Sequence, residues 1–248
     1  MTSDPLAPLL ELPGVRAAME GARAGVDGLL GHRVLRRRSA EVSAEAGLRS
    51  ARASAALEGV EIGLEQIRAG VSDPLLTGAL RVATGLGSLA DTIDRAPLQA
   101  LARLHSLAAR GLVADKELGR PRTDPAIGSR LSGLAELIVA RRPGSALLLA
   151  AVIHGELLAV RAFYPAGGVV ARGAARLVLV ARGLDPKALT VPDVGHLARR
   201  EEYALTAGAY ADGDPGPWLV HCAEAARLGA VESLAVCEAL SRTAETLG

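Results

Sequence analysis

Residues 154–172, HGELLAVRAFYPAGGVVAR, decide the fold of this 248-residue chain. An apolar run precedes this stretch from about residue 145, and a second apolar run continues after it until Gly183. Apolar residues on nearly every side of a helix indicate that the helix is buried. The pattern therefore predicts a central helix over about 145–162, a glycine-containing turn, and a second apolar helix over about 169–182.

The turn between these helices is a candidate anion site. Gly167 and Gly168 let a ligand approach the backbone closely. The N-terminus of the second helix supplies free N–H groups and the positive end of the helix dipole, which suits a phosphate. The alternative is an ordinary interhelical turn that needs glycine only for its backbone conformation.

Helical signals also dominate the chain on both sides of this centre. Ser72-Asp73-Pro74 and Ala96-Pro97 are helix starts, and a long final helix is expected over about 217–246. Residues 118–128 hold prolines and glycines among polar residues, so we expect a loop or short hairpin there. Residues 1–40 are loosely patterned, with many glycines, and predict a poorly packed lead-in. One all-α domain is the economical interpretation of the rest.

Composition narrows the classes of function. Half of the residues are hydrophobic and the formal net charge is +1, which argues against intrinsic disorder and against a strongly basic nucleic-acid binder. The longest apolar run, residues 146–153, is far shorter than the roughly 20 residues of a membrane span. With acidic residues and no basic start before Pro13, we expect no export signal and a cytoplasmic protein.

The central stretch resembles the Fic/Doc (Fic-fold) family, whose enzymes mostly transfer AMP from ATP to a protein hydroxyl. The family motif reads His-Pro-Phe-x-Asp/Glu-Gly-Asn-Gly-Arg-x-x-Arg between two helices. Phe163, Gly168 and Arg172 match the motif phenylalanine, its last glycine and its closing arginine. His154 stands seven residues before Arg161, as a further family histidine often precedes the motif histidine.

Five other segments resemble the family in the right order: Ser54–Gly59 (the inhibitory helix, about 52–60), Leu104-His105 (the helix before the flap), Gly119–Arg122 (the flap), and Glu202-Tyr203 and Pro217-Trp218 (the helices after the core). The resemblance implies an all-α, Fic-like helical bundle with a short β-hairpin flap over residues 41–248. In the family the flap aligns the target peptide.

The departures from the motif bear on activity. Arg161 occupies the position of the general base and stays protonated, so it cannot accept a proton. Pro165 replaces the acidic Mg²⁺ ligand, Val169 replaces the first motif arginine, and Ala166 and Gly167 replace a glycine and the asparagine. Losing base, metal ligand and a phosphate clamp together predicts that ordinary adenylyl transfer (AMPylation) is absent and that Mg²⁺ is not bound.

Several residues remain that suit an anion. Arg161, Gly167, Gly168 and Arg172 are the candidate anion- or nucleotide-binding residues, for ATP or another phosphate-containing small molecule. In the family the inhibitory glutamate pairs with the closing arginine, and here Glu58 and Arg172 hold those positions. The pair is either a structural bridge or a gate that still closes a pocket.

Three functions follow from these residues: a degenerate family member that acts as a binding or regulatory module, an active transferase of altered chemistry (nucleotidyl, phosphoryl or glycosyl transfer to a protein hydroxyl), or a structural, partner-binding helical protein with a collapsed pocket. A protein partner or target and a homo-oligomer are compatible with each of them. We expect neither nucleic acid nor a membrane as a partner.

The remaining candidates have simpler interpretations. We expect His154 and His105 to be hydrogen-bonded structural histidines, Glu156 a polar helix residue in place of a displaced acid or base, Ser54 a packing or capping residue, and Tyr164 a packing residue in place of a base-stacking one. Cys222 and Cys237 are expected as core thiols. No metal site is predicted, because His32, His196 and His221 lack partners at metal-ligand spacing in the sequence.

Overall fold

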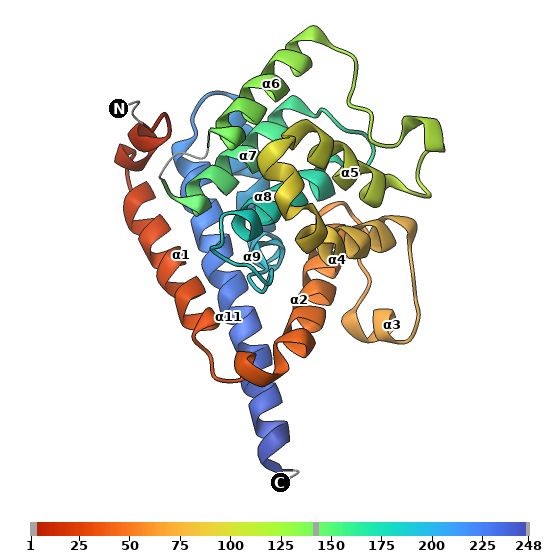
Figure 1. The fold of residues 1–248 in the computed structure, drawn as a ribbon, viewed down its shortest axis with the longest axis vertical. Helices are drawn as coiled ribbons and strands as arrows, with labels where there is room; N and C mark the ends of the chain where they lie inside the picture. The colour runs from red at the N-terminus through yellow and green to blue at the C-terminus, as the bar shows by residue number, and fades with distance from the viewer. Residues whose placement is uncertain (1–3, 141–143, 247–248) are drawn as a thin grey trace.

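The structure is a computed structural model that describes residues 4–140 and 144–246, and the described residues form an all-α bundle (Figure 1). It contains two short 3₁₀ helices, Ala7–Glu11 and Asp115–Glu117. The α-helices are α1 (Val15–Leu30), α2 (Leu35–Leu57), α3 (Leu64–Arg68), α4 (Pro74–Arg95), α5 (Pro97–Ala109), α6 (Pro125–Val139), α7 (Ala146–Val160), α8 (Gly167–Ala181), α9 (Pro192–Ala198), α10 (Arg200–Ala211) and α11 (Gly216–Thr246). Within the described ranges, no helix combines the length and the apolarity that crossing a bilayer requires.

The α7–α8 pair lies at the centre, as its apolar sequence predicts. Helix α7 is buried over most of its length, and it begins where the Ser145 hydroxyl accepts the Leu148 N–H at 3.3 Å. One part of the core joins α7 and α8 to α2, α4, α5 and α6. The other part joins them to α1, the first half of α2, α10 and α11. Two apolar layers therefore share this pair and fix the turn between them.

Local sequence signals account for several helix ends. The Asp73 carboxylate accepts the N–H groups of Leu75 and Leu76, and Pro74 occupies the first helical position of α4. Gly183, with φ at 72°, follows α8 and ends it in the left-handed conformation. Both ends were predicted from the residue types.

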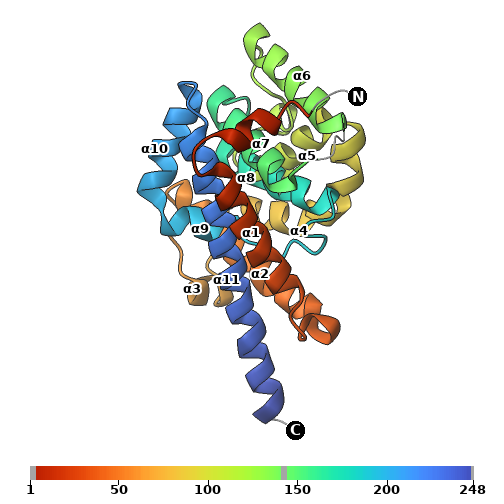
Figure 2. The ribbon, with the colours of Figure 1, turned by 90° about the vertical axis from the view of Figure 1, so that its left-hand side faces the viewer.

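The N-terminal segment differs from the poorly packed lead-in that we expected. Helix α1 runs along α11 in two views (Figures 1 and 2), and its buried side chains are Val15, Met19, Ala22, Val26 and Leu29. Their spacing of three and four residues is that of one helix face. The intervening glycines and charged residues concealed this face in the sequence. Residues 1–3 lie outside the described residues.

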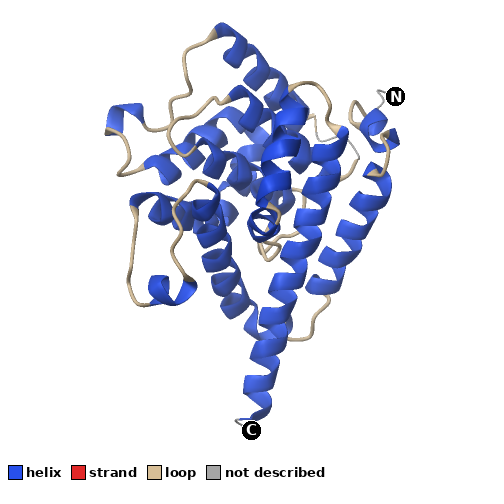
Figure 3. Cartoon of the chain, turned by 180° about the vertical axis from the view of Figure 1, so that it is seen from behind, coloured by secondary structure: helices blue, strands red, loops and turns tan. Residues whose placement is uncertain are grey.

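The expected β-hairpin flap is also not formed in the described residues, which contain no strand (Figure 3). The segment after α5 has a single isolated bridge between Arg110 and Val113, then a 3₁₀ turn and an irregular loop. Helix α6 starts at Pro125, inside the predicted loop, because the Asp124 carboxylate accepts the Ala126 N–H at 2.8 Å. The Arg122 N–H donates to the carbonyl of Ala162 at 2.7 Å and holds the loop beside the α7–α8 turn.

Helix α11 packs unusually close to α9. A Cβ atom at Gly229 would collide with the backbone of Val191 and Pro192, and a Cβ atom at Gly195 would collide with the backbone of Ala225. Backbone atoms cannot move aside as a flexible side chain does. These two glycines therefore set the approach that brings the side chains of α9 and α11 together.

We predict that Gly229→Ala lowers the free energy of unfolding by about 1–3 kcal/mol, because the added methyl group overpacks this crossing. Gly87→Ala is the matched control: Gly87 also lies within a helix, but no atom is within 4 Å of its Cβ position. That variant should gain about 0.5–1 kcal/mol from helix propensity. Urea denaturation of both variants measures the difference, and equal effects would contradict the close packing.

Candidate functional site

The α7–α8 turn forms the floor of an open cleft. Helix α8 begins at Gly167, after Ala166 in the left-handed conformation with φ at 63°. The Val170 N–H bonds to the carbonyl of Ala166, whereas the N–H groups before it have no partner within the helix. The cleft has a volume of about 940 Å³, and α10 and the Glu58 side chain form other parts of its wall. A helix begins beneath the diglycine, as the sequence predicts.

Arg161 stands at the rim of this cleft. It ends α7 in the left-handed conformation with φ at 50°, and its side chain is exposed. It borders both the cleft and a neighbouring hollow of about 700 Å³ that is lined by the loop residues Arg120 and Arg122. The guanidinium is therefore placed to contact an anionic ligand, but not to accept a proton.

Arg172 points into the protein and does not line the cleft. Its Nε donates to the Ser54 hydroxyl at 2.9 Å, and its Nη1 donates to the Tyr203 hydroxyl at 3.1 Å. Its Nη2 donates to the Ser54 carbonyl at 3.0 Å and to Glu58 Oε1 at 2.8 Å, and Asp193 lies 3.7 Å from Nε. Burial by itself would lower the pKa of Arg172, but Tyr203, Glu58 and Asp193 together raise that pKa above its ordinary value.

The predicted contact between Glu58 and Arg172 is present. Glu58 follows the last residue of α2, and its carboxylate reaches across to the start of α8. A Cβ atom at Gly168 would collide with Glu58 Oε1, so the carboxylate lies directly against this glycine. The candidate anion position at the N-terminus of α8 therefore already has an anion of the protein beside it. Figure 1 shows how α2 and α8 lie within the bundle.

A cluster of rings lies behind Arg172, deeper in the bundle. Nε2 of His154 is 3.0 Å from the Tyr203 hydroxyl, which also accepts from Arg172. Nδ1 of His196 is 3.0 Å from Nε2 of His221, and Nδ1 of His221 is 3.2 Å from Glu202 Oε1. The Glu58–Arg172 pair is thus connected to the interior through Tyr203 and His154.

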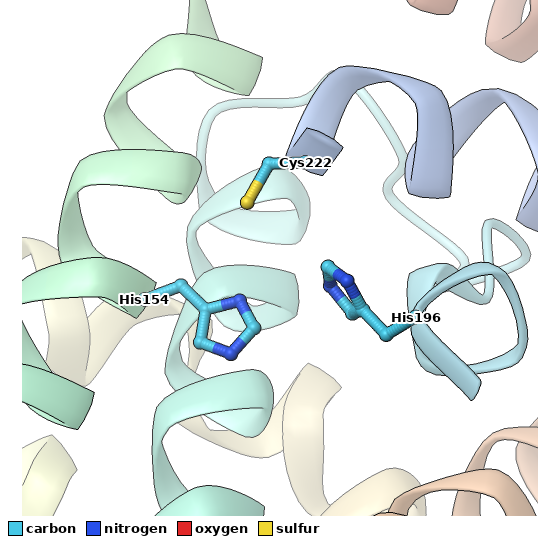
Figure 4. Close-up of side chains that lie close together, drawn as sticks. All are labelled: His154, His196 and Cys222. Atoms are coloured by element: carbon cyan, nitrogen blue, oxygen red, sulfur yellow. The ribbon is translucent and has the colours of Figure 1, made fainter. Parts of the chain in front are cut away.

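The cluster also brings three metal-ligating side chains together (Figure 4). Ligand atoms of His154, His196 and Cys222 all lie within 4.8 Å of one another. The three residues are far apart in the chain and come from α7, α9 and α11, so their spacing in the sequence predicted no partners for His196. The adjacent pair His221-Cys222 was the available signal, but nothing in the sequence placed it next to His154.

Burial sets the protonation state of this cluster. It lowers the pKa of His154 and His196 well below the ordinary value, and nearby Arg172 lowers both further. It lowers the pKa of His221 as well, although the hydrogen bond to Glu202 opposes the shift. Burial also raises the pKa of the Cys222 thiol, and it raises the pKa of Tyr203 to about 12. The histidines are therefore neutral at pH 7.

The other candidates have mainly structural contacts. His105 Nδ1 accepts the Gly119 N–H at 3.1 Å, and its ring lies against Phe163. Glu156 pairs with Arg130 and accepts a hydrogen bond from Tyr210, so it does not line the cleft as an acid or base would. Tyr164 has 82% of its surface exposed beside the cleft, so it does not pack as we expected.

Ser54 and the second cysteine are buried. Ser54 is 4% exposed and both its hydroxyl and its carbonyl contact Arg172. Cys237 and Cys222 are both core thiols, as predicted.

Asp193 is a residue of the site that was not predicted. The sequence marked it only as part of a helix start, whereas its carboxylate lies 3.7 Å from Nε of Arg172 and 3.9 Å from Nε of Arg176.

Comparison with known structures identifies the fold. A Fic family protein from Desulfovibrio desulfuricans superposes with a TM-score of 0.73 at 21% identity, over 88% of this chain and 74% of that chain. A Fic-1 fragment from C. elegans superposes with a TM-score of 0.71 at 17% identity, over 91% and 73%. A glutamate-to-glycine variant of that fragment gives 0.70 at 19%, over 89% and 72%. The sequence matches no family model and no curated protein. This chain therefore has the Fic fold.

We predict that acid destabilises the protein through its buried histidines. The pKa of an unfolded histidine is about 6.5, whereas burial holds the folded pKa of His154 and His196 well below that value. The unfolded state therefore takes up more protons, and the stability that is complete above pH 6.5 falls below it. Between pH 7.5 and 5.5 each of the two histidines should account for up to about 1.4 kcal/mol. Urea denaturation at both values measures the loss, and unchanged stability would contradict it.

We predict that Gly168→Ala breaks the contact between Glu58 and Arg172, because the new methyl group needs the space of the carboxylate. Removing one partner of a buried pair costs about 3–5 kcal/mol. Since Glu58 is partly exposed, we expect roughly 1–3 kcal/mol here.

Gly167→Ala is the matched control, because no atom lies within 4 Å of that Cβ position. In a Glu58→Gln background the Gly168 substitution should cost less, since the ion pair is already lost. Thermal or urea denaturation measures the wild type and the four variants. Equal costs at the two glycines, or full additivity with Glu58→Gln, would count against the contact.

Proposed function

We propose that this chain is a degenerate Fic-family protein, a pseudoenzyme that binds a phosphate-bearing ligand in its cleft. In this proposal Glu58 occupies the phosphate position at the N-terminus of α8 until the ligand displaces it. The observation that carries the proposal is the Glu58 carboxylate against Gly168, at the positive end of α8 and paired with Arg172. A helix N-terminus with a nearby guanidinium suits an external phosphate as well as an internal carboxylate. The ligand and Glu58 then compete for one position.

The proposed loss of adenylyl transfer rests on the side chains at the turn. Arg161 is a permanent cation where transfer needs a proton acceptor, and general-base catalysis is worth about 10²–10⁴ in rate. Pro165 offers no carboxylate for a divalent cation, and Val169 is buried in place of a phosphate-binding arginine. Mg²⁺ and transfer chemistry are therefore not part of the proposal.

Glu58 fits a gate better than a permanent bridge. Its side chain is 27% exposed, whereas that of Arg172 is 2% exposed. If the Glu58 side chain moves away, Arg172 keeps Ser54, Tyr203 and Asp193 as partners. The buried positive charge of Arg172 therefore stays compensated. A ligand phosphate would replace the negative charge that leaves. The cleft of about 940 Å³ is large enough for a nucleotide.

We predict that Glu58→Gly increases the affinity for ATP, ADP or another phosphate ligand. A ligand at a hundredfold excess over its Kd stabilises the folded state by about 2.7 kcal/mol, which raises the Tm of a chain of this size by roughly 5–10 °C. We expect this rise for Glu58→Gly and a smaller one for the wild type in thermal denaturation. Adding Arg161→Ala to Glu58→Gly should reduce it.

Glu61→Gly is the control for removing a carboxylate from the same segment, since Glu61 pairs with Arg200 and does not line the cleft. If no phosphate compound raises the Tm of the wild type or of Glu58→Gly, the cleft does not bind a phosphate ligand. The chain is then a structural or partner-binding protein. If the wild type transfers label from ATP to a protein, and does so as fast as a variant with Arg161→His, Gly167→Asn and Val169→Arg, an active transferase replaces the proposal.

A further inference from the structure

We propose that His154, His196 and Cys222 form a binding site for one Zn²⁺ ion inside the bundle, behind the Glu58–Arg172 pair. The three side chains come from α7, α9 and α11 and converge on one point (Figure 4). None of the three metal-binding side chains lines the cleft of the proposed function, so the metal site is separate from that cleft.

The distances fit a small rearrangement. Zn–N distances of about 2.0 Å and Zn–S distances of about 2.3 Å place the ligand atoms of one ion roughly 3.5 Å apart. The ligand atoms here lie within 4.8 Å of one another before any ion is present. Side-chain shifts of about 1 Å therefore complete three-coordinate binding.

Hydrogen bonding orients the imidazole of His196 for metal binding. The Glu202 carboxylate accepts, so the hydrogen on His221 lies on Nδ1 and His221 Nε2 carries a lone pair. His221 Nε2 must then accept from Nδ1–H of His196, at 3.0 Å. This relay leaves Nε2 of His196 with its lone pair. A ligating histidine commonly donates the hydrogen of its other ring nitrogen in this way, which fixes its tautomer and the orientation of its ring.

His154 has one ring nitrogen to spare. Nε2 contacts the Tyr203 hydroxyl, whose oxygen accepts from Arg172 and has room for a second hydrogen. The other nitrogen, Nδ1, lies on the side of Cys222 (Figure 4). When Nε2 donates to Tyr203, Nδ1 is free to bind a metal.

The surroundings favour a zinc-like ion over Mg²⁺ or Ca²⁺. The three side chains help to line a cavity of about 30 Å³, which is enough for an ion or one water molecule. Two imidazoles and a thiolate are soft or borderline ligands, which select zinc rather than hard cations. Arg172 and Arg176 also border the cavity and disfavour a dication, whereas the thiolate and Asp193 offset their charge. On binding, the Cys222 thiol passes its proton to solvent and its sulfur bonds to the ion.

The test uses the full chain, produced in medium supplemented with zinc, desalted and analysed for metal content. We expect about one Zn²⁺ per wild-type chain and less than a tenth of that in Cys222→Ala. Cys237→Ala is the matched control, because Cys237 is a second buried cysteine of α11 outside the cluster, and it should retain the metal. Loading with Co²⁺ should give thiolate-to-cobalt charge-transfer absorption in the wild type and in Cys237→Ala.

The cobalt spectrum of the wild type decides the matter even if Cys222→Ala fails to fold. A wild type that retains no zinc and shows no thiolate charge transfer overturns the proposal. Equal zinc in wild type and Cys222→Ala also overturns it, since the metal then lies elsewhere. Neither result bears on nucleotide binding, and a missing nucleotide response leaves this test unaffected.

Discussion

The buried charge of Arg172 is the constraint on which the site depends. A guanidinium that is 2% exposed must have its hydrogens satisfied inside the protein. Ser54 and Glu58 from the end of α2 and Tyr203 from α10 accept these hydrogens, and the Asp193 carboxylate of α9 lies 3.7 Å away as a further negative charge. One side chain of α8 therefore fixes the places of three other helices, and of these α10, together with Glu58 at the end of α2, lines the cleft.

The same constraint explains why glycine stands at position 168. The Glu58 carboxylate can pair with Arg172 only by passing directly against the first turn of α8, where a Cβ atom would block it. Negative charge at a helix N-terminus is favourable, so the location stabilises the carboxylate twice, through the dipole and through Arg172. Arg161 lies at the far end of the turn and takes no part in this arrangement.

Some features of the structure were predictable from the sequence because they depend on neighbouring residues. The apolar runs of α7 and α8, the Asp73 cap and the Gly183 stop are local, and the Glu58–Arg172 contact followed from the resemblance to the Fic family. The predicted β-hairpin flap was wrong because the loop around residues 110–124 forms one isolated bridge and no pair of strands. Residue types alone do not reveal this. The cluster of His154, His196 and Cys222 was not predicted for a different reason. It depends on how closely α9 and α11 pack, and the sequence gives no sign that the glycines at this crossing allow such a close approach.

The ring cluster also limits how Arg172 can respond to events in the cleft. Tyr203 accepts from Arg172 and contacts His154, so a movement of the guanidinium toward the cleft must break or stretch this chain of hydrogen bonds. Helix α7, which carries His154, is anchored from the other side by Trp218, whose Nε1 donates to the Ala151 carbonyl at 2.9 Å. The interior partners of Arg172 are thus held by further hydrogen bonds, whereas Glu58 is the partner that is partly exposed and can move. In the proposed function, a ligand that competes for this position therefore displaces the glutamate, whereas the arginine stays where the fold holds it.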